Sequence, residues 1–401
     1  MFVNLTGNIP LNSRICIYGS LKVGIFLKRF LELTRKDVKI VCFLDSFKSG
    51  IIDNLKIINI ADIKEIESEY DLIVITSSNI HAISDILQAY NIQNYTYIHT
   101  EAFKWLVNFI DDVIYFEHSS NMKISEDFIK NNSAMFEKAR SVFESAKDRE
   151  LYDLAIKSRC NKESFDKLSE YIIRNFNLVN TQYFEFINKD AIKVVFDCGA
   201  YDGATVVKFL NNFAKAEKVY AFEPLYKIFA RKPFSTTIHN SDKIEMFEYA
   251  LWDCKKTFQF KNQNGGSRID FLVNPDPLNN SKKKFKDIET EVFHSVQTIS
   301  IDEFMQENNI NELDFAKFDI EGAELCALKG AKNSLIKHRP QLAVCLYHKN
   351  EDFYEIPLYL SSILSNYTFK FAHQYLGVWD SILYAIPNEL YNSNQTSCLE
   401  P

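Results

Sequence analysis

The sequence predicts two α/β domains, each built on a mainly parallel sheet, with a helical segment between them. Short apolar runs alternate with helical periodicity from about residue 11 to 99 and again from 191 to 387. Such alternation is typical of strands joined by crossover helices, which place neighbouring strands in one orientation. The strand-like runs disappear in between, and 401 residues exceed one ordinary core. The expected organisation is a smaller domain at 1–100, a helical connector at 101–189, a larger domain at 190–390 and a loose tail at 391–401.

The first stretch carries four runs whose length and composition are typical of strands. They are RICIYG, VKIVCFLDS, YDLIVITSS and YTYIH. Between them, KVGIFLKRFLEL and HAISDILQAY place apolar residues three and four positions apart, which predicts helices. We therefore expect a small Rossmann-like sheet covered by helices.

A glycine pattern follows the first of these strands. Gly19 and Gly24 occupy the outer positions of G-x-G-x-x-G, but Leu21 replaces the middle glycine that lets the backbone reach a pyrophosphate. Asp45 ends the second strand, where a ribose-binding acid lies in dinucleotide folds. The domain resembles small nucleotide- or sugar-binding modules attached to carbohydrate-modifying enzymes. Because of Leu21, we interpret it as a recognition or dimerisation module, the latter implying a homodimer, and keep nucleotide binding as the weaker alternative.

The segment from about 100 to 189 has helical periodicity alone. Ser125, with Asp127 close behind it, is a typical helix start. A helical connector can form a lid over the next domain or serve as a plain spacer. Both interpretations stay open.

The second stretch contains seven strand-like runs. They are IKVVFDCG, EKVYAFEP, KIEMFEYALWD, DFAKFDIEG, QLAVCLYH, YTFKFAHQ and SILYAIP. The last two have no long helix between them, which predicts a terminal antiparallel hairpin. The ends of the first, second and fourth of these strands carry acidic side chains.

The turn in VVFDCGAYDGATV, residues 194–206, contains two carboxylates, Asp197 and Asp202. A dinucleotide turn holds a pyrophosphate at a helix N-terminus and favours no acid there. Carboxylates suit a ligand with cationic groups, such as S-adenosylmethionine with its ammonium and sulfonium. Glu223 ends the second strand, where an acid accepts hydrogen bonds from a ribose diol. The two acids and the turn glycines together predict a cofactor crevice at the carboxyl ends of the strands.

ALWD, at the end of the third run, offers a surface for the adenine. Trp252 would supply an apolar wall and Asp253 a polar group. A core position for Trp252 is an equal alternative.

At this point the larger domain resembles the FkbM-type methyltransferases, over about residues 180–387. The resemblance is carried by QYFEF, VVFDCGAYDGATV, YAFEP, TISIDEF, KFDIEGAELCALKGAKNSLIKHRPQLAVCLYHK and SILYAIP. It implies a class I methyltransferase fold with a seven-stranded sheet and S-adenosylmethionine as the cofactor. By motif matching it implies cofactor roles for Asp197, Gly199, Gly203 and Glu223. The expected cofactor residues are Asp197, Gly199, Tyr201, Asp202, Gly203, Glu223, Trp252 and Asp253.

Methyl transfer to a hydroxyl needs positioning and a nearby base. Asp319, after the fourth strand, is the first candidate for a base or orienting group, with Glu321 beside it. Glu324 fits better as a structural acceptor for backbone amides. His348 ends the fifth strand and is a second candidate base, whereas His373 is a weaker candidate near the substrate.

A metal is not assigned. Asp319, Glu321 and a histidine could hold Mg²⁺, which prefers oxygen ligands, but no HxxxH or comparable spacing is present. The segment 262–291 is expected to be a long loop over the site, with Ser267 and Arg268 contacting the acceptor. The run 282–284 of three lysines is interpreted as solvated surface rather than an anion site.

Composition limits the functional classes. A net charge of −7 argues against nucleic acid as a partner. Eight cysteines without a CxxC pair are typical of a reduced chain, and the N-terminus carries no signal-peptide pattern. No apolar run reaches the ~20 residues of a membrane span. We therefore expect a cytoplasmic protein.

The predicted function is an S-adenosylmethionine-dependent O-methyltransferase. The resemblance implies a hydroxyl of a carbohydrate as acceptor, nucleotide- or lipid-linked or free, in surface polysaccharide or glycan synthesis. One alternative is an NAD-dependent nucleotide-sugar oxidoreductase that uses the N-terminal domain. Another is a non-catalytic ligand-binding protein that keeps the methyltransferase fold.

Overall fold

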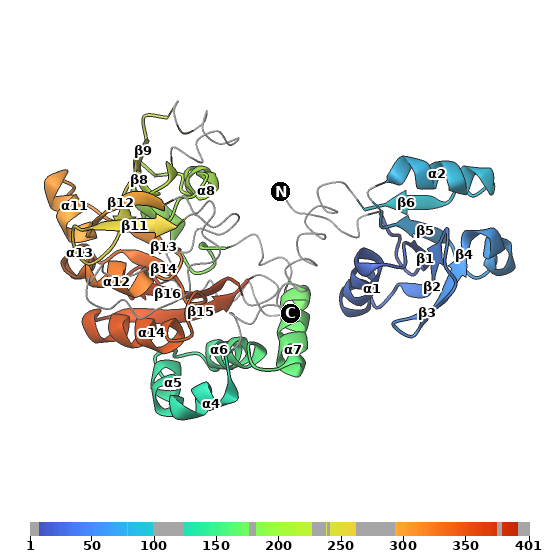
Figure 1. Cartoon of the computed structure of the whole chain (residues 1–401), viewed down its shortest axis with the longest axis horizontal. Coiled ribbons are helices and arrows are strands. Elements are labelled where there is room, and N and C mark those ends of the chain that lie inside the picture. Colours follow the sequence, from blue (N-terminus) through green and yellow to red (C-terminus); the bar gives the residue numbers. More distant parts are fainter. Residues whose placement is uncertain are drawn as a thin grey trace, which may run out of the picture. The chain divides into compact units, whose positions relative to one another are not determined.

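A computed structural model describes residues 8–77, 79–98, 124–175, 182–226, 238, 241–261, 293–374 and 379–391. These residues form two compact units (Figure 1). Unit 1 contains the described residues of 8–98 and 158–175. Unit 2 contains those of 124–157, 182–374 and 379–391.

Unit 1 is built on a six-stranded sheet in the order β3-β4-β2-β1-β5-β6. All neighbouring strands are parallel except β3 and β4. The strands are β1 (Arg14–Tyr18), β2 (Lys39–Asp45), β3 (Gly50–Ile52), β4 (Leu55–Asn59), β5 (Leu72–Ile75) and β6 (Tyr95–Tyr97). The helices are α1 (Lys22–Thr34), the 3-10 helix η1 (Ile60–Ile66), α2 (Ile80–Ala89) and α7 (Lys162–Arg174).

Both faces of this sheet are covered. Successive side chains of a strand point to opposite faces, so Ile15 and Ile17 of β1 pack with α1 and α7. Cys16 and Tyr18 pack on the other face with η1 and α2. The expected Rossmann-like sheet and its two helices are confirmed.

The β3–β4 hairpin was not predicted. Asp53 and Asn54 connect its strands with φ of 49° and 60°. Two consecutive residues of positive φ are typical of a tight hairpin turn, and Asp and Asn tolerate this conformation. The Asp-Asn pair between two apolar runs was therefore an available signal.

Unit 2 is built on a seven-stranded sheet in the order β15-β16-β14-β13-β7-β8-β9. The strands are β7 (Val194–Cys198), β8 (Lys218–Phe222), β9 (Ile244–Phe247), β13 (Phe315–Phe318), β14 (Gln341–Cys345), β15 (Tyr367–His373) and β16 (Ser381–Pro387). Only β16 runs antiparallel to its neighbours β14 and β15. This confirms the seven-stranded sheet with a terminal antiparallel hairpin.

A second, three-stranded sheet has the order β10-β12-β11. Its strands are β10 (Ala250–Leu251), β11 (Thr257–Lys261) and β12 (Phe293–Ile299). The prediction of KIEMFEYALWD as one strand was wrong, because the chain leaves the large sheet after Phe247. Ala250 then pairs with Thr298 of β12 rather than with β8.

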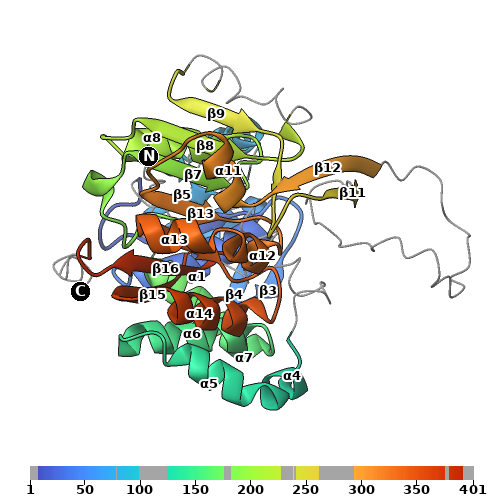
Figure 2. The ribbon, with the colours of Figure 1, turned by 90° about the vertical axis from the view of Figure 1, so that its left-hand side faces the viewer.

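Helices cover both faces of the seven-stranded sheet (Figures 1 and 2). Phe304 of α11 packs against Phe196 of β7 on one face, and Phe209 of α8 packs against Phe315 of β13 on the other. The helices of unit 2 are α4 (Glu126–Asn131), α5 (Ser133–Arg140), α6 (Ala146–Ser158), η4 (Lys189–Ala191), α8 (Ala204–Asn212), α11 (Ile301–Glu307), α12 (Glu324–Lys329), α13 (Lys332–His338) and α14 (Asp352–Ile363).

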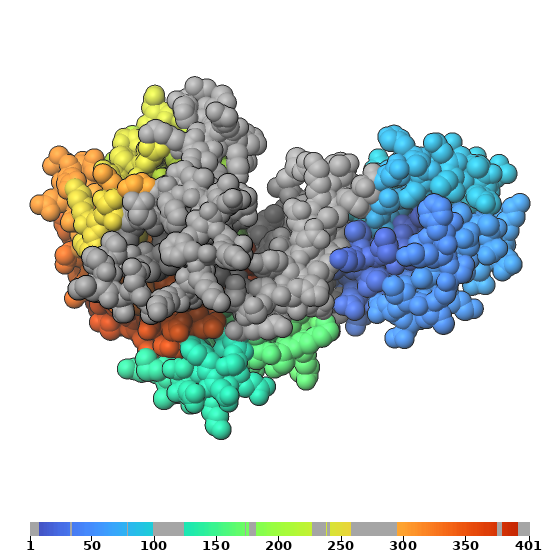
Figure 3. All heavy atoms as spheres, in the orientation of Figure 1, coloured from blue at the N-terminus to red at the C-terminus, as the bar shows by residue number. Residues whose placement is uncertain are grey.

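The segment expected to be a connector is divided between the units. Phe136 of α5 packs edge-to-face on Tyr354 of α14 at 5.1 Å between ring centroids, and the teal atoms of this segment lie directly below red-orange atoms in Figure 3. Ile172 of α7 instead joins the core of unit 1. The helix start at Ser125 is confirmed, because its side chain accepts a hydrogen bond from the backbone amide of Phe128. The domain boundaries themselves stay predictions.

Glu185 gives unit 2 a pH-dependent stability. It accepts a hydrogen bond from Gln374, and burial raises the pKa of its carboxyl from 4.5 to about 7. The folded chain thus keeps a proton that the unfolded chain has lost, so stability falls as pH rises through this range. The free energy of unfolding of the wild type is expected to fall by on the order of 2–3 kcal/mol between about pH 4.5 and pH 7, and Glu185→Gln is expected to abolish this decrease.

Denaturant unfolding at several pH values tests this expectation. The exposed Glu355→Gln variant on α14 is the control and should keep the slope of the wild type. An unchanged slope in Glu185→Gln would contradict the assignment.

Candidate functional site

The turn after β7 lies close to two neighbouring strand ends. The backbone amides of Gly199 and Ala200 both donate to the carbonyl of Phe222, at 3.0 Å each. Gly199 has a φ of +93°, and a Cβ there would lie 1.8 Å from the carbonyl oxygen of Asp319. Only glycine fits this position. The turn between β7 and α8 therefore lies against the end of β8 and the end of β13.

The turn that leads into α8 has an unusual backbone conformation. Gly203 precedes the helix with a φ of +84°, and Tyr201 has a φ of 47°. The side chain of Asp202 accepts a hydrogen bond from the backbone amide of Ala204 at 3.1 Å. Asp202 thus stabilises the start of α8, and the sequence did not predict this hydrogen bond to Ala204.

Glu223 follows β8 with 7% of its surface exposed. One carboxylate oxygen accepts from the amide of Tyr201 at 3.1 Å and the other from the amide of Leu225 at 3.0 Å. Burial raises the pKa of Glu223, and the two amides oppose that shift. Each oxygen keeps a further lone pair, so the fixed carboxylate can accept two hydrogen bonds from a diol.

Lys317, which sequence analysis missed, lies between the predicted acids. Its side chain is 1% exposed, and its Nζ lies 3.1 Å from Asp197 and 3.9 Å from Asp319. It also donates to the carbonyl of Gly199 at 2.6 Å. A lysine two residues before Asp319 in a buried strand was the available signal, since both side chains share one face.

Asp197 is fully buried and has partners within the chain. Thr205 of α8 donates a hydrogen bond to its carboxylate, opposite Lys317. Burial raises the pKa of Asp197, and Lys317 opposes this. Burial by itself would lower the pKa of Lys317, but Asp197 and Asp319 raise it above its usual value. Asp197 therefore fixes the turn through an ion pair, and its direct contact with a cofactor stays a prediction.

Asp319 presents a partly exposed carboxylate beside the turn, with 22% of the side chain exposed. The hydroxyls of Tyr183 and Tyr347 donate to its two oxygens at 2.8 and 3.0 Å. Burial favours a higher pKa, but Lys317 and His348 hold the pKa of Asp319 below its ordinary value. The side chain is thus an oriented carboxylate at neutral pH.

His348 lies among three carboxylates and is 3% exposed. Its Nδ1 is 2.8 Å from Glu324, and its Nε2 is 3.4 Å from Asp319 and 3.7 Å from Glu321. Burial favours a lower pKa, but the carboxylates outweigh it and raise the pKa of His348 to about 9. The structure therefore brings together the three predicted catalytic residues.

Glu324 has the structural contact that the sequence predicted. It is fully buried and accepts a hydrogen bond from the backbone amide of Ile320 at 2.8 Å. Glu321 has a φ of +57° and a side chain that is 40% exposed. His373 is buried in the β15–β16 hairpin, where its Nδ1 lies 2.8 Å from the hydroxyl of Ser381.

The other predicted contacts lie elsewhere. Trp252 and Asp253 follow β10 of the small sheet, so they do not directly follow the third strand of the large sheet as expected. The amide of Trp252 donates to Ile299 of β12. Ser267, Arg268 and the lysine run fall outside the described residues.

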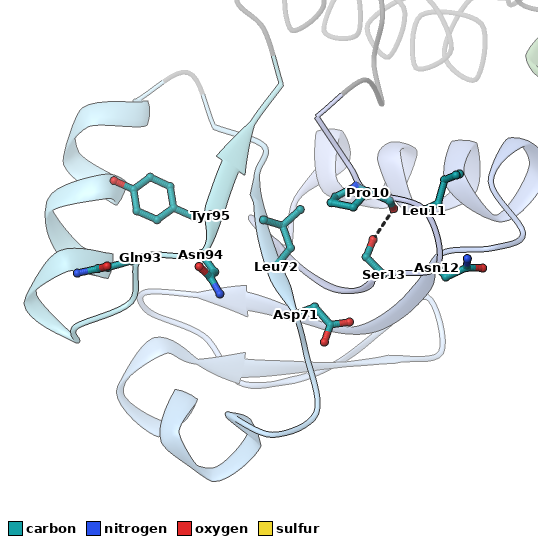
Figure 4. A pocket seen from close by; sticks show the side chains of 9 residues that line it. All are labelled: Pro10, Leu11, Asn12, Ser13, Asp71, Leu72, Gln93, Asn94 and Tyr95. Carbon is teal, nitrogen blue, oxygen red and sulfur yellow. Dashed lines mark hydrogen bonds between the residues drawn. The ribbon is translucent and has the colours of Figure 1, made fainter.

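Unit 1 has polar side chains at the carboxyl ends of β1 and β2. Gly19 follows β1, and the Asp45 carboxylate accepts from Ser20 at 2.6 Å and from the amide of Phe47 at 2.9 Å. A cavity of about 540 Å³ lies at the opposite edge of the sheet, by the amino ends of β1, β5 and β6 (Figure 4). Its lining residues are Pro10, Leu11, Asn12, Ser13, Asp71, Leu72, Gln93, Asn94 and Tyr95. Nucleotide binding by this unit stays a prediction.

Comparison with known proteins concerns mainly unit 2. Residues 197–371 match the family described as methyltransferase FkbM domain. Over 174 residues the chain is 26% identical to 2-O-methyltransferase NoeI of Sinorhizobium fredii (strain NBRC 101917 / NGR234). This alignment covers 43% of the chain and 69% of the relative.

Two solved structures are also similar. Methyltransferase FkbM from Methylobacillus flagellatus KT has a TM-score of 0.47 and 17% identity, over 95% of this chain and 92% of that chain. Human N-acetylserotonin methyltransferase in complex with S-adenosylmethionine has a TM-score of 0.27 and 12% identity, over 69% of this chain and 70% of that chain. No helix among the described residues has the length and apolar character needed to cross a membrane.

Proposed function

We propose that residues 197–371, which match the methyltransferase FkbM family, bind S-adenosylmethionine, and that the protein methylates a hydroxyl of a carbohydrate acceptor. Transfer to oxygen is supported by the name of the relative, a 2-O-methyltransferase. The carbohydrate class rests on the family resemblance, whose members commonly methylate hydroxyls of sugars, polyketides or related small molecules, and on the resemblance of the N-terminal domain to modules of carbohydrate-modifying enzymes. We place the reaction in the cytoplasm, in surface polysaccharide or glycan synthesis with a free, nucleotide-linked or lipid-linked acceptor.

The residues after β7 and β8 fit the cofactor. Gly199 and Gly203 keep side chains out of the turn, and Glu223 holds two acceptor oxygens in place. We propose that Glu223 binds the ribose hydroxyls and that the turn approaches the rest of the cofactor. S-adenosylmethionine supplies an activated methyl group when bound.

The contact between the turn and the carboxylate cluster carries the proposal. Gly199 packs so closely on the backbone of Asp319 that a Cβ there would lie 1.8 Å from its carbonyl oxygen, so the turn and the residue with the partly exposed carboxylate are direct neighbours. Tyr183 and Tyr347 orient that carboxylate from two sides. We propose that Asp319 binds and orients the acceptor hydroxyl and accepts its proton as a general base. The ring of His348 is buried and is therefore less able to contact the acceptor.

Calorimetric titration of the full chain tests the cofactor site. Wild-type protein should bind S-adenosylmethionine, and Glu223→Gln should weaken binding by a factor of about 10–100, because a charged acceptor of two hydrogen bonds is lost. Glu355→Gln, which changes an exposed acid on α14, should bind as the wild type does.

The same titration with NADH separates the alternatives. NADH binding without S-adenosylmethionine binding would overturn the proposal and move the site to the Gly19–Asp45 edge of unit 1. Methyl transfer from labelled S-adenosylmethionine to a panel of mono- and oligosaccharides then tests the acceptor. Cofactor binding without transfer to any member of the panel would contradict the carbohydrate assignment.

A further inference from the structure

Three side chains from different elements meet beside the cofactor turn. Asp319 follows β13, Glu324 begins α12 and His348 follows β14. One ligand-type atom from each lies within 4.8 Å of the other two. Two ligands of one ion, each bound at about 2.0–2.2 Å, lie about 3.0–4.4 Å apart, so these atoms would need to move only slightly closer to hold an ion. The three strand and helix ends therefore present a converging set of two carboxylates and one imidazole.

His348 provides an independent sign of a missing partner. Among the described residues, neither of its buried ring nitrogens has a hydrogen-bond partner, and the second oxygen of Glu324 has none either. Nδ1 and an oxygen of Glu324 lie 2.8 Å apart, which makes them an ion pair when the imidazole is protonated. Buried polar atoms are nearly always paired, and unpaired ones cost stability. A bound cation would take one ring nitrogen and the second oxygen of Glu324 as ligands, while the other nitrogen keeps its neighbouring carboxylate.

The charges around the imidazole ring of His348 also favour a bound cation. Three carboxylates lie within 4 Å of the imidazole nitrogens. The buried cation of Lys317 is paired with Asp197 at 3.1 Å and lies farther from Asp319, at 3.9 Å. The imidazole is therefore the group that faces these carboxylates, and a divalent ion in place of its proton would bring them a further positive charge.

We propose that Asp319, Glu324 and His348 bind one divalent metal ion of the Mn²⁺ type. Mg²⁺ prefers oxygen ligands alone, whereas one imidazole with carboxylates suits a first-row transition ion. Asp319 is the most exposed of the three, so the open side of the ion faces the place proposed for the acceptor. There the metal would take an acceptor hydroxyl as a ligand and orient it. This role rests on the proposed function, whereas metal binding itself does not.

Mn²⁺ binding is measured on the full chain by electron paramagnetic resonance, in which the signal of free Mn²⁺ falls as the ion binds. We expect saturable binding of one Mn²⁺ per chain. His348→Gln and Asp319→Asn should each weaken it by a factor of about 10 or more, since each removes one ligand. Glu355→Gln should not change it. Circular dichroism of each variant establishes that it is folded, and Asp319→Asn, at a partly exposed position, is the variant expected to fold most readily.

The outcomes separate this proposal from the proposed function. No binding, or binding that neither variant weakens, overturns the metal site. Full methyl transfer after treatment with a chelator overturns the metal's role in the reaction and leaves the methyltransferase assignment standing. Site-specific Mn²⁺ binding in a chain that transfers no methyl group to the saccharide panel supports the metal site and contradicts the carbohydrate O-methyltransferase assignment.

Discussion

Asp319→Asn is expected to lower the rate of methyl transfer by a factor of about 10²–10⁴ while leaving the binding of S-adenosylmethionine within about threefold of the wild type. The substitution keeps the shape of the side chain and removes its charge. One tyrosine hydroxyl can still donate to the remaining carbonyl oxygen, and the other can accept a hydrogen bond from the new amide nitrogen, so the local structure should persist. The acceptor hydroxyl, in contrast, loses the carboxylate that we propose orients it.

Glu321→Gln is the matched comparison for this variant. Glu321 is the neighbouring acid, but its side chain is 40% exposed and its carboxylate lies 3.7 Å from His348. We expect a loss of less than about tenfold in the rate, because a carboxylate this exposed contributes less to positioning than the oriented carboxylate of Asp319. Formation of S-adenosylhomocysteine with an acceptor from the saccharide panel measures both rates. A larger loss for Glu321→Gln than for Asp319→Asn would reverse the assignment.

Lys317→Met is expected to have the largest effect on stability, a loss of about 3–5 kcal/mol in the free energy of unfolding. Lys317 is 1% exposed and Asp197 is fully buried, so the substitution leaves a buried carboxylate without its cation. It also removes the donor to the carbonyl of Gly199. Methionine fills much of the space of the lysine stem, so the loss of charge dominates over the loss of volume.

Two further variants make this prediction specific. Lys193→Met removes the exposed ion pair with Glu217 and should cost less than about 1 kcal/mol. Asp197→Asn added to Lys317→Met should recover part of the loss, because no unpaired charge then remains buried. Guanidinium unfolding curves give the three values. Equal losses for Lys317→Met and Lys193→Met would show that the buried pair has no special role.

The architecture could be predicted from the sequence because its signals are local. Each strand of the large sheet except the third was recognised from one apolar run, and the final hairpin followed from the missing helix between the last two runs. The prediction of a single strand over the third run was wrong, because Phe247 and Ala250 lie in similar apolar sequence. Only pairing with β12, a distant segment, draws Ala250 into another sheet.

Part of the site was also determined by the sequence. Gly199, Glu223 and Asp319 were predicted to share one edge, since the carboxyl ends of adjacent parallel strands meet there. The structure places Gly199 against Asp319 and Glu223 against the amide of Tyr201. These relations need only the strand order and the position of each residue in its strand.

The ionic partners were decided by the tertiary structure alone. Lys317 pairs with Asp197, and Glu324 approaches His348, although neither pair is close in sequence. A charge in a sequence carries no sign of how deeply it will be buried or which opposite charge it will meet. Burial and distance set the strength of an electrostatic interaction, and both arise only when the strands and helices have packed. The sequence therefore determined where the acids lie along the sheet edge, and packing decided which of them are paired, oriented or able to bind a cation.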